Sequence, residues 1–308
     1  MTIKFTDKVA IVTGAGAGLG RSHALGLAAR GAKVVVNDLG RDGQAPESAL
    51  AVVKEITNLG GEAIAHGANV ADMDQVQDMV DQAMSKWGRV DILVNNAGIL
   101  RDKTFSKMTI EDFKLVVDVH LMGAVNCTKA VWEIMKTQEY GRIVMTSSSS
   151  GLYGNFGQSN YGAAKMGLVG LMNVLAQEGR KYNIHVNALA PTAATQMTEG
   201  LITPQMTELM TPESVTPALL FLVSEGAPTR TIVGAGAGAY AVTRIFETDG
   251  LWLAKEDQTP EGIAANWDNL MSTDNQKELM IAGDQTLKFV QKAAEALGID
   301  LNSEFGVK

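Results

Sequence analysis

Hydrophobic residues recur along the chain in two alternating patterns. Six short runs rich in Val, Ile and Ala predict β-strands, at residues 9–13, 33–38, 62–70, 91–96, 142–147 and 184–190. The longer segments between them repeat apolar residues every three or four positions, which predicts helices at 19–30, 47–59, 72–87, 109–137 and 159–181. Three polar residues that begin such segments are expected to cap them: Asp72, Thr109 and Ser159.

This alternation of strands and helices predicts the fold class. The strands are apolar at nearly every position, as in a parallel sheet that is covered on both faces. Right-handed crossovers between such strands produce an α/β protein with a doubly wound, Rossmann-type sheet. The chain contains no internal repeat, so we expect one main domain.

The pattern changes after about residue 225. The Gly/Ala-rich stretch 234–240 is expected to be flexible, and the apolar runs 242–247 and 251–254 around Thr248-Asp249-Gly250 predict a β-hairpin. Two helical segments follow, at 259–271, with Pro260 in the first turn, and at 284–297. We therefore expect a domain at 1–225 and a C-terminal extension at 226–308, made of the last strand, the hairpin and two helices and packed on the same domain.

Composition excludes some classes of function. The 308 residues contain 26 Lys and Arg against 34 Asp and Glu, and the net charge of −8 disfavours a nucleic-acid partner. No apolar run reaches membrane-spanning length and the first strand follows no leader pattern, so we expect a soluble, cytoplasmic protein with no membrane partner. The single cysteine, Cys127, excludes an internal disulfide and is expected to be a packed core thiol.

A glycine-rich segment connects the first strand to the first helix, with Gly14, Gly16, Gly18, Leu19 and Gly20 in its sequence TGAGAGLG. Glycines let the backbone approach a pyrophosphate, and the free N–H groups at the helix start bind its charge. Glycines also form ordinary turns, but the strand–turn–helix position favours a dinucleotide site.

Asp38 ends the second strand, 20 residues beyond Gly18. A carboxylate at this spacing accepts hydrogen bonds from a ribose 2′-hydroxyl and repels a 2′-phosphate, so NAD is favoured over NADP. A solvated carboxylate at a strand end is the alternative, and Arg41 lies close enough to weaken the preference.

Asn95-Asn96-Ala97-Gly98 closes the fourth strand. Small residues there allow a ribose to lie across the strand end, and side-chain amides can hold the turn. The alternative is an ordinary Asn/Gly turn. We include Asn95, Ala97 and Gly98 among the candidate cofactor contacts.

Ser148, Tyr161 and Lys165 form the candidate catalytic group. Ser148 ends a strand 13 residues before Tyr161, which opens a helix and shares a helix face with Lys165. One ammonium about 4–5 Å from a phenol, at an effective dielectric of 20, favours the phenolate by roughly 3–4 kcal/mol, and desolvation opposes this effect. The spacing thus predicts a tyrosine activated for proton transfer. The alternatives are a polar turn for the serine and a surface pair for Tyr161 and Lys165.

In this order, TGAGAGLG, NNAG and a serine 13 positions before YGAAK resemble the short-chain dehydrogenase/reductase family over roughly 1–225. The resemblance implies hydride transfer between a nicotinamide cofactor and a carbonyl/alcohol pair, with no metal ion. It implies that Tyr161 is the acid/base, that Ser148 hydrogen-bonds the substrate oxygen, and that Lys165 binds the cofactor ribose and lowers the pKa of the phenol.

Longer strings are similar to one branch of this family, the (3R)-hydroxyacyl-CoA dehydrogenase modules of multifunctional β-oxidation enzymes. They include VVVNDLG, NAGILRDKTF, DVHLMG, YGNFGQSNYGAAK and, in the extension, TPEGIAANWDNL. The branch implies NAD-dependent oxidation of a (3R)-3-hydroxyacyl-CoA by a homodimer or higher homo-oligomer. A hydroxysteroid dehydrogenase acting on a free steroid or a steroid side-chain CoA ester is an alternative with the same catalytic group. A non-catalytic NAD-binding scaffold is an alternative of another class.

Three positions depart from the pattern of the wider family. His120 replaces an Asn that helps to hold a relay water, and it is expected to act as a relay itself, with a core-packed imidazole as the equal alternative. Pro191-Thr192 replaces Pro-Gly, with Thr195 as the candidate partner of the carboxamide. Asn69-Val70 replaces Asp-Val at the expected adenine contact.

The substrate side is less defined in the sequence. The stretch 192–211, with Met197, Met206 and Met210, is expected to form a lid that adapts to a variable acyl chain, although each methionine could instead fill the core. No cationic cluster marks a site for the phosphates of CoA, for which we consider only Arg101, Lys103 and Arg244.

Overall fold

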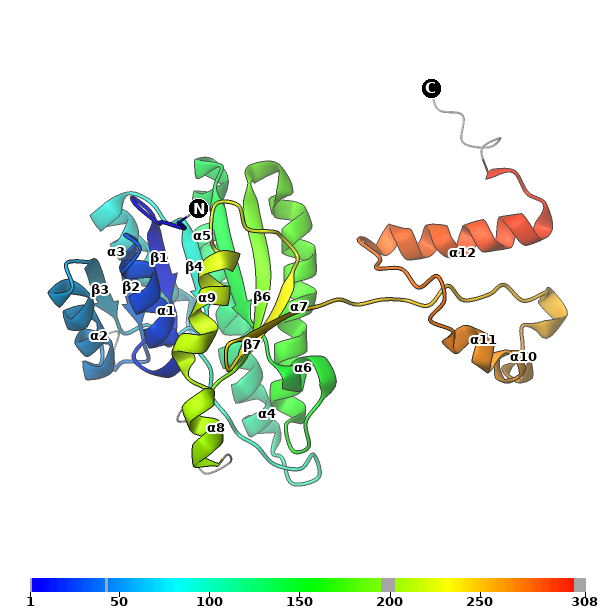
Figure 1. Ribbon diagram of the computed structural model, residues 1–308, viewed down its shortest axis with the longest axis horizontal. Helices are drawn as coiled ribbons and strands as arrows, with labels where there is room; N and C mark the ends of the chain where they lie inside the picture. The colour runs from blue at the N-terminus through cyan, green and yellow to red at the C-terminus, as the bar shows by residue number, and fades with distance from the viewer. Residues whose placement is uncertain (1, 42–43, 195–202, 302–308) are drawn as a thin grey trace. The chain divides into compact units, whose positions relative to one another are not determined.

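The computed structural model describes residues 2–41, 44–194 and 203–301 (Figure 1). The chain divides into two compact units, residues 1–243 and 244–308. The division lies later than the predicted boundary at 225, because the last strands, β7 (Ile232–Gly236) and β8 (Ala239–Thr243), belong to the first unit. That the remaining extension packs on the first unit stays a prediction.

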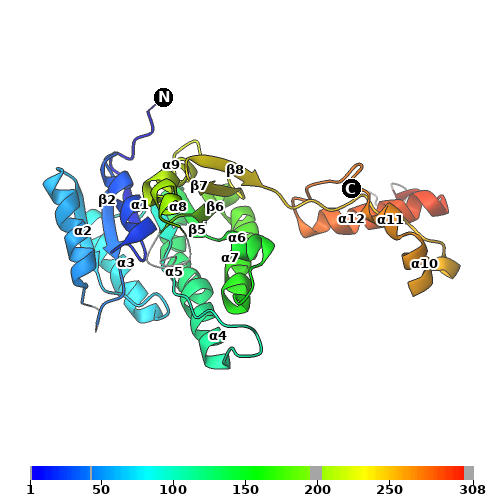
Figure 2. The same cartoon turned by 60° about the horizontal axis from the view of Figure 1, so that its bottom comes forward.

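The first unit contains an eight-stranded sheet with the strand order β3-β2-β1-β4-β5-β6-β7-β8. The strands before β7 are β1 (Val9–Val12), β2 (Lys33–Asn37), β3 (Glu62–His66), β4 (Ile92–Asn95), β5 (Gly141–Thr146) and β6 (Ile184–Thr192). All pairs from β3 to β7 are parallel, and β8 pairs antiparallel with β7 at the edge (Figure 2). The predicted doubly wound α/β fold is thus confirmed.

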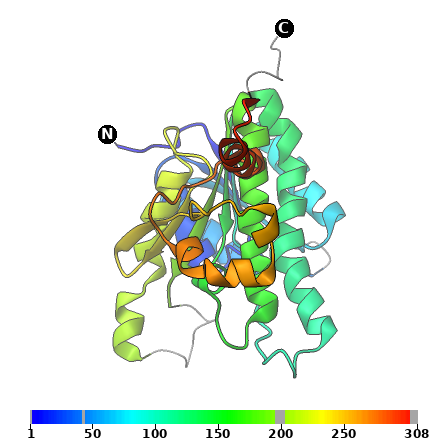
Figure 3. The same cartoon turned by 90° about the vertical axis from the view of Figure 1, so that its right-hand side faces the viewer.

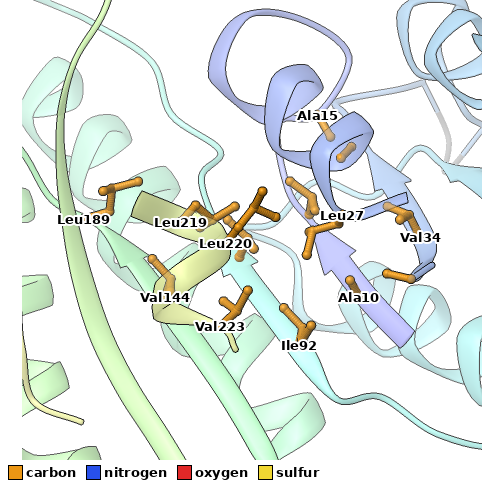
Figure 4. Packing of buried hydrophobic residues seen from close by; sticks show 14 of the residues in the cluster. Ala10, Ala15, Leu27, Val34, Ile92, Val144, Leu189, Leu219, Leu220 and Val223 are labelled. Atoms are coloured by element: carbon orange, nitrogen blue, oxygen red, sulfur yellow. The ribbon is translucent and has the colours of Figure 1, made fainter. Parts of the chain in front are cut away.

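Helices cover both faces of the sheet. One layer contains α1 (Gly18–Ala28), α2 (Glu47–Asn58) and α9 (Pro212–Leu222), and the other contains α3 (Met73–Trp87), α5 (Gly123–Gln138) and α7 (Ser159–Gly179). Successive strand residues alternate between the two cores: Ala10 and Val12 of β1 pack in the first core, shown in Figure 4, and Ile11 packs in the second. Because both faces are buried, the strands are apolar at nearly every position.

The hairpin lies earlier in the chain than predicted. β7 and β8 are joined by Ala237-Gly238, both with positive φ (50° and 76°), as a type I′ hairpin turn requires. The stretch 234–240, which was expected to be flexible, therefore forms strand and turn. The predicted hairpin around Thr248-Asp249-Gly250 is wrong, since 251–254 form no strand and Glu247 makes an isolated bridge to Lys277.

The predicted helix 109–137 changes its geometry in the middle. α4 (Ile110–Val117) runs into a π-helical segment, η1 (Asp118–Met122), which continues as α5. The predicted strand 62–70 ends already at His66. Within the described residues, the sequence patterns missed three α-helices: α6 (Ser149–Tyr153), α8 (Pro204–Leu209) and α9.

Two of the three predicted helix caps are confirmed. The side chain of Asp72 accepts hydrogen bonds from the backbone of residues 74 and 75, and that of Thr109 accepts one from Asp112 N at 3.1 Å. Ser159 is the first residue of α7 and not its cap, because Gln158 takes that position.

The second unit, orange to red in Figure 3, contains the short helices α10 (Pro260–Ala265) and α11 (Trp267–Met271) and the longer α12 (Ala282–Leu297). Pro260 lies in the first turn of α10 as predicted, but the helix predicted over 259–271 is interrupted at Asn266. Ion pairs from Lys288 to Glu247 and from Lys292 to Asp249 hold α12 to the segment before it. Across the described residues of both units, every helix is too short or too polar to cross a bilayer.

Candidate active site

The carboxyl ends of β1, β4 and β5 bring the predicted site residues to one edge of the sheet. The strand order reverses between β1 and β4, and in doubly wound folds ligands bind in the crevice at this point. The glycine-rich loop follows β1, the turn 95–98 follows β4, and Ser148 follows β5.

The glycine-rich loop has the shape of a phosphate cradle. Gly14 has a φ of +61°, and a Cβ there would lie 2.8 Å from Ala97 Cα. A Cβ on Gly20 would lie 2.1 Å from Gly14 O. α1 begins at Gly18 after Ala17, which has no side-chain oxygen to cap the first N–H groups. These N–H groups therefore suit the pyrophosphate of a dinucleotide.

Thr13 and Asn96 join this loop to the turn after β4, and neither was among the predicted site residues. Asn96 Nδ2 donates to Thr13 O at 2.9 Å and to Gly14 O at 3.1 Å. Thr13 Oγ1 accepts from Asn96 N and Ala97 N, both at 3.0 Å. Each residue is a polar side chain inside a predicted motif, which could have marked it as a site residue. The contact between them could not be predicted, because they lie about 80 residues apart in the sequence.

The Asp38 carboxylate is fixed against the glycine-rich loop. Its Oδ2 accepts from Gly16 N at 3.0 Å and lies 3.4 Å from Ser48 Oγ, while its Oδ1 accepts from Leu39 N at 2.8 Å. A Cβ on Gly16 would lie 2.1 Å from Oδ2. A glycine cradle, a helix start and a carboxylate at the next strand end together fit a nicotinamide dinucleotide.

The next residues are the predicted cofactor contacts that follow β3 and lie in or after β6. Val70 is buried, and Asn69 Oδ1 accepts from Ala71 N at 3.0 Å, which fixes the amide in a turn. Pro191 lies in β6 opposite Ala235 of β7. Thr195 and Met197 lie outside the described residues.

The structure brings the four predicted catalytic residues together. Ser148 caps α6, its Oγ accepts from Ser150 N at 3.2 Å, and its hydroxyl lies near enough to the Tyr161 phenol to lower the pKa of that phenol. Lys165 Nζ lies 5.4 Å from the centroid of the Tyr161 ring and donates to Thr146 O at 2.5 Å. His120 meets the same ring edge-on, with 5.1 Å between the ring centroids.

Asn160 is a supporting residue that the sequence reasoning missed. It is fully buried, and its Oδ1 accepts from Tyr161 N at 2.7 Å. Its Nδ2 donates to Arg101 O at 3.1 Å, so the loop after β4 is held against the start of α7. Gln158 strengthens this junction by donating to Asp102 Oδ2 at 2.6 Å.

The three cations considered for the phosphates of CoA already have carboxylate partners. Lys103 Nζ lies 2.9 Å and Arg101 Nε 4.0 Å from oxygens of Asp112. Arg244, in the second unit, pairs with Glu278 at 2.6 Å. A phosphate would have to compete with these carboxylates for all three cations.

Burial dominates the ionisation of the catalytic group. It raises the pKa of Tyr161, the hydrogen bond from Ser148 opposes this rise, and the nearby Asp102 carboxylate adds to it. Burial lowers the pKa of Lys165 from 10.5 to about 7 and, together with the charge of Lys165, that of His120 from 6.5 to about 3. For Tyr161 the direction is opposite to the predicted one, because desolvation outweighs the opposing effect of Ser148.

Replacing Lys165 with Met is expected to stabilise the fold at low pH. The lysine pKa is about 7 in the folded protein, against 10.5 for an unperturbed lysine, so burial of its charge costs stability below pH 7. This cost, at most about 5 kcal/mol, disappears as the pH rises towards 10.5. Loss of the bond to Thr146 O offsets about 1–3 kcal/mol. We expect a net gain of about 2–4 kcal/mol near pH 6, and a small net loss near pH 10, where the lost bond exceeds the remaining cost of the charge.

Urea unfolding of Lys165→Met and wild type at both pH values measures this difference. The exposed Lys129 provides the control, since Lys129→Met should change stability little and equally at both pH values. A Lys165→Met variant with the same stability difference at both pH values contradicts the cost assigned to the buried charge.

A dinucleotide cradle next to a Ser–Tyr–Lys group on a doubly wound sheet defines an oxidoreductase of the dehydrogenase type. The short chain dehydrogenase family matches residues 8–205, and the chain belongs to that family. The family assignment confirms the resemblance found in the sequence.

Two relatives extend the similarity beyond the common family domain. Peroxisomal multifunctional enzyme A of Dictyostelium discoideum is 47% identical over 280 residues, which cover 89% of this chain and 62% of that protein. The structure of full-length peroxisomal multifunctional enzyme type 2 from Drosophila melanogaster has a TM-score of 0.81 and 37% identity, over 96% of this chain and 51% of that one. The chain thus spans between half and two thirds of the length of these relatives.

A third similar protein has been solved with its ligands bound. The structure of a 7α-hydroxysteroid dehydrogenase complexed with NADH and 7-oxo glycochenodeoxycholic acid has a TM-score of 0.70 and 31% identity. The match covers 77% of this chain and 95% of that one. It supports a nicotinamide cofactor for this fold and site.

Proposed function

We propose that this protein oxidises a (3R)-3-hydroxyacyl-CoA to the 3-oxoacyl-CoA with NAD. The observation that carries the proposal is the convergence of Ser148, Tyr161 and Lys165 beside the glycine-rich loop and Asp38. The strings shared with hydroxyacyl-CoA dehydrogenase modules, and the similarity to peroxisomal multifunctional enzymes, support the acyl-CoA substrate.

In this reaction the Ser148 hydroxyl holds the substrate oxygen and the Tyr161 phenolate accepts the hydroxyl proton. Lys165 binds the ribose hydroxyls of the cofactor and stabilises the phenolate. The bound nicotinamide supplies the hydride acceptor for the hydrogen on C3. Because burial raises the pKa of Tyr161, the phenol is protonated at neutral pH in the ligand-free protein, and we expect the oxidation rate to rise with pH.

A hydroxysteroid dehydrogenase is the second candidate. Its support is the similarity to the 7α-hydroxysteroid dehydrogenase, whose structure contains 7-oxo glycochenodeoxycholic acid on the same fold. The catalytic group serves either substrate, so only the substrate-binding residues distinguish the two functions.

A substrate panel tests the proposal. We expect NADH formation with (3R)-3-hydroxyacyl-CoAs of graded length, at a kcat/KM at least roughly 100-fold above that of the (3S) forms, a difference of about 3 kcal/mol. The CoA-free hydroxy acids and a free 7α-hydroxysteroid are the comparisons. A higher kcat/KM for the steroid favours the second candidate, and no turnover with any member of the panel favours a non-catalytic scaffold.

We also propose that the protein acts in the cytoplasm as a homodimer or a higher homo-oligomer. The resemblance to the multifunctional-enzyme branch supports this assembly. Light scattering coupled to gel filtration measures the mass in solution, and a monomer at micromolar concentration contradicts the assembly.

A further inference from the structure

The segment after β3, residues 67–70, lies beside the carboxylate that is expected to hold the cofactor ribose. Asp38 N donates to His66 O at 3.2 Å, and Gly40 N donates to Gly67 O at 3.1 Å. The pyrophosphate belongs to the glycine-rich loop and the ribose to Asp38. Because the adenine base is bonded to this ribose, we expect it to contact residues 67–70.

The backbone of this segment is held by side chains. Residues 67–70 form neither helix nor strand, so their backbone N–H and C=O groups need other partners. Three amide side chains, from β2, α3 and α5, each make one hydrogen bond of 3.0 Å with this backbone: Asn37 with Ala68 O, Gln75 with Asn69 N and Asn126 with Val70 O. The shape of the segment therefore depends on side chains from three surrounding elements.

His66, the last residue of β3, makes a fourth bond of this kind. Its Nδ1 accepts from Ala68 N at 3.1 Å, so Nδ1 is the unprotonated ring nitrogen and Nε2 carries the proton. Nε2 lies 3.0 Å from Asp78 Oδ2 of α3 and donates to it. The imidazole thus connects the Ala68 N–H group to a carboxylate on α3, and this carboxylate fixes the orientation of the ring.

The bond to Ala68 N is difficult to replace. His66 and Ala68 are 3% and 1% exposed, so water does not readily reach the N–H group. A buried N–H group without an acceptor is strongly disfavoured, and the segment would have to rearrange to find one. A ligand that needs the original shape would then bind more weakly, because binding would have to restore that shape.

We propose that His66 is a positioning residue for the adenosine half of the cofactor. Its ring holds residues 67–70 in the binding shape through Ala68 N, and Asp78 holds the ring. These contacts lie after β3 and on α3, whereas the catalytic group follows β5 and opens α7, so the effect falls on cofactor affinity and leaves kcat unchanged. The identity of the ligand rests on the proposed function, but the hydrogen bonds do not.

Two variants isolate the acceptor at position 66. An Asn side chain readily accepts a hydrogen bond from the backbone N–H two residues further on, so His66→Asn should keep the bond to Ala68 N and lose only the contact with Asp78. A Leu side chain offers no acceptor, so His66→Leu should lose both contacts.

Calorimetric titration with ADP-ribose, which contains the adenosine and the pyrophosphate without the nicotinamide, measures the effect. We expect His66→Leu to raise the Kd of ADP-ribose roughly 10-fold, as the loss of one hydrogen bond allows, and His66→Asn to keep it within about three-fold. Equal losses in the two variants, no loss in His66→Leu, or a wild type that does not bind ADP-ribose overturns the proposal.

His185 provides a matched control. It is partly buried, and its Nδ1 lies 2.8 Å from the backbone oxygen of Ala227. It lies at the amino end of β6, whereas the cofactor site lies at the carboxyl ends of the strands. His185→Leu should therefore leave the Kd of ADP-ribose within about two-fold, and a loss equal to that of His66→Leu contradicts a local effect of His66.

Amide hydrogen exchange in the protein without ligand tests the bond itself. We expect the Ala68 N–H to exchange roughly 10-fold faster in His66→Leu than in the wild type, and at close to the wild-type rate in His66→Asn. Unchanged exchange in His66→Leu overturns the assignment of this bond to the shape of the segment.

Kinetics separate this role from a general structural one. With an active wild type, we expect His66→Leu to raise KM for NAD roughly 10-fold and to leave kcat within about two-fold, and an equal fall in kcat overturns the positioning role. If the wild type binds ADP-ribose but oxidises no member of the substrate panel, the proposed function fails, while the titration and the exchange rates still decide the role of His66.

Discussion

Tyr161→Phe is expected to reduce kcat for NAD-dependent oxidation by roughly 10²–10⁴-fold, the usual contribution of a general acid/base. The phenol is the group that accepts the substrate proton in the proposed reaction, and the phenyl ring keeps its packing against His120. Ser148 cannot replace it, because an aliphatic hydroxyl is far less acidic than a phenol. NADH formation measures kcat, and quenching or enhancement of NADH fluorescence measures cofactor affinity, which should stay within a few-fold.

Tyr153 supplies the matched control for this substitution. It lies on α6, is 72% exposed, and its hydroxyl lies 3.1 Å from Thr243 Oγ1. Tyr153→Phe should leave kcat within about two-fold, since an exposed hydrogen bond contributes little. Full turnover by Tyr161→Phe contradicts the acid/base role, and parallel loss of turnover and cofactor affinity points instead to a structural role.

The fold could be predicted from the sequence because periodicity and parallel pairing are linked. A strand buried on both faces is apolar at nearly every position, and the run that became β1 shows this directly. The catalytic group could be predicted for a similar reason. Tyr161 and Lys165 are four positions apart on one helix, and Ser148 follows a strand that ends at the same sheet edge.

The predictions that failed concern features that depend on contacts between distant segments of the chain. The turn of the β7–β8 hairpin places Ala237 at a positive φ, which its sequence does not signal, whereas Asp249-Gly250 has typical turn residues without forming a hairpin. The partnership of Thr13 with Asn96, and the burial that raises the pKa of Tyr161, exist only after β1, β4 and α7 have assembled. Local patterns carry no information about such contacts.

Asp38→Asn is expected to weaken the preference for NAD over NADP by up to roughly 10⁴–10⁵-fold in kcat/KM. In the wild type, a unit charge on a 2′-phosphate about 4 Å from the carboxylate costs about 4 kcal/mol at an effective dielectric of 20. Loss of a hydrogen bond from the ribose to a charged acceptor costs NAD about 1.5–3 kcal/mol. Both effects lower the ratio of kcat/KM for NAD to kcat/KM for NADP, because the variant binds NADP better and NAD worse.

The Asn variant is preferable to Ala because it keeps an oxygen for the bond from Gly16 N, which holds the loop for either cofactor. A damaged loop would lower kcat/KM for NAD and NADP together. A change in the ratio of the two kcat/KM values therefore reports the effect of the Asp38 charge alone. Ser48→Ala is the control, since Ser48 Oγ reaches the same carboxylate only at 3.4 Å and should leave the ratio within about three-fold. A wild type that prefers NADP contradicts the assignment of Asp38 to the ribose. An unchanged ratio in Asp38→Asn shows that another residue, such as the neighbouring Arg41, sets the selectivity.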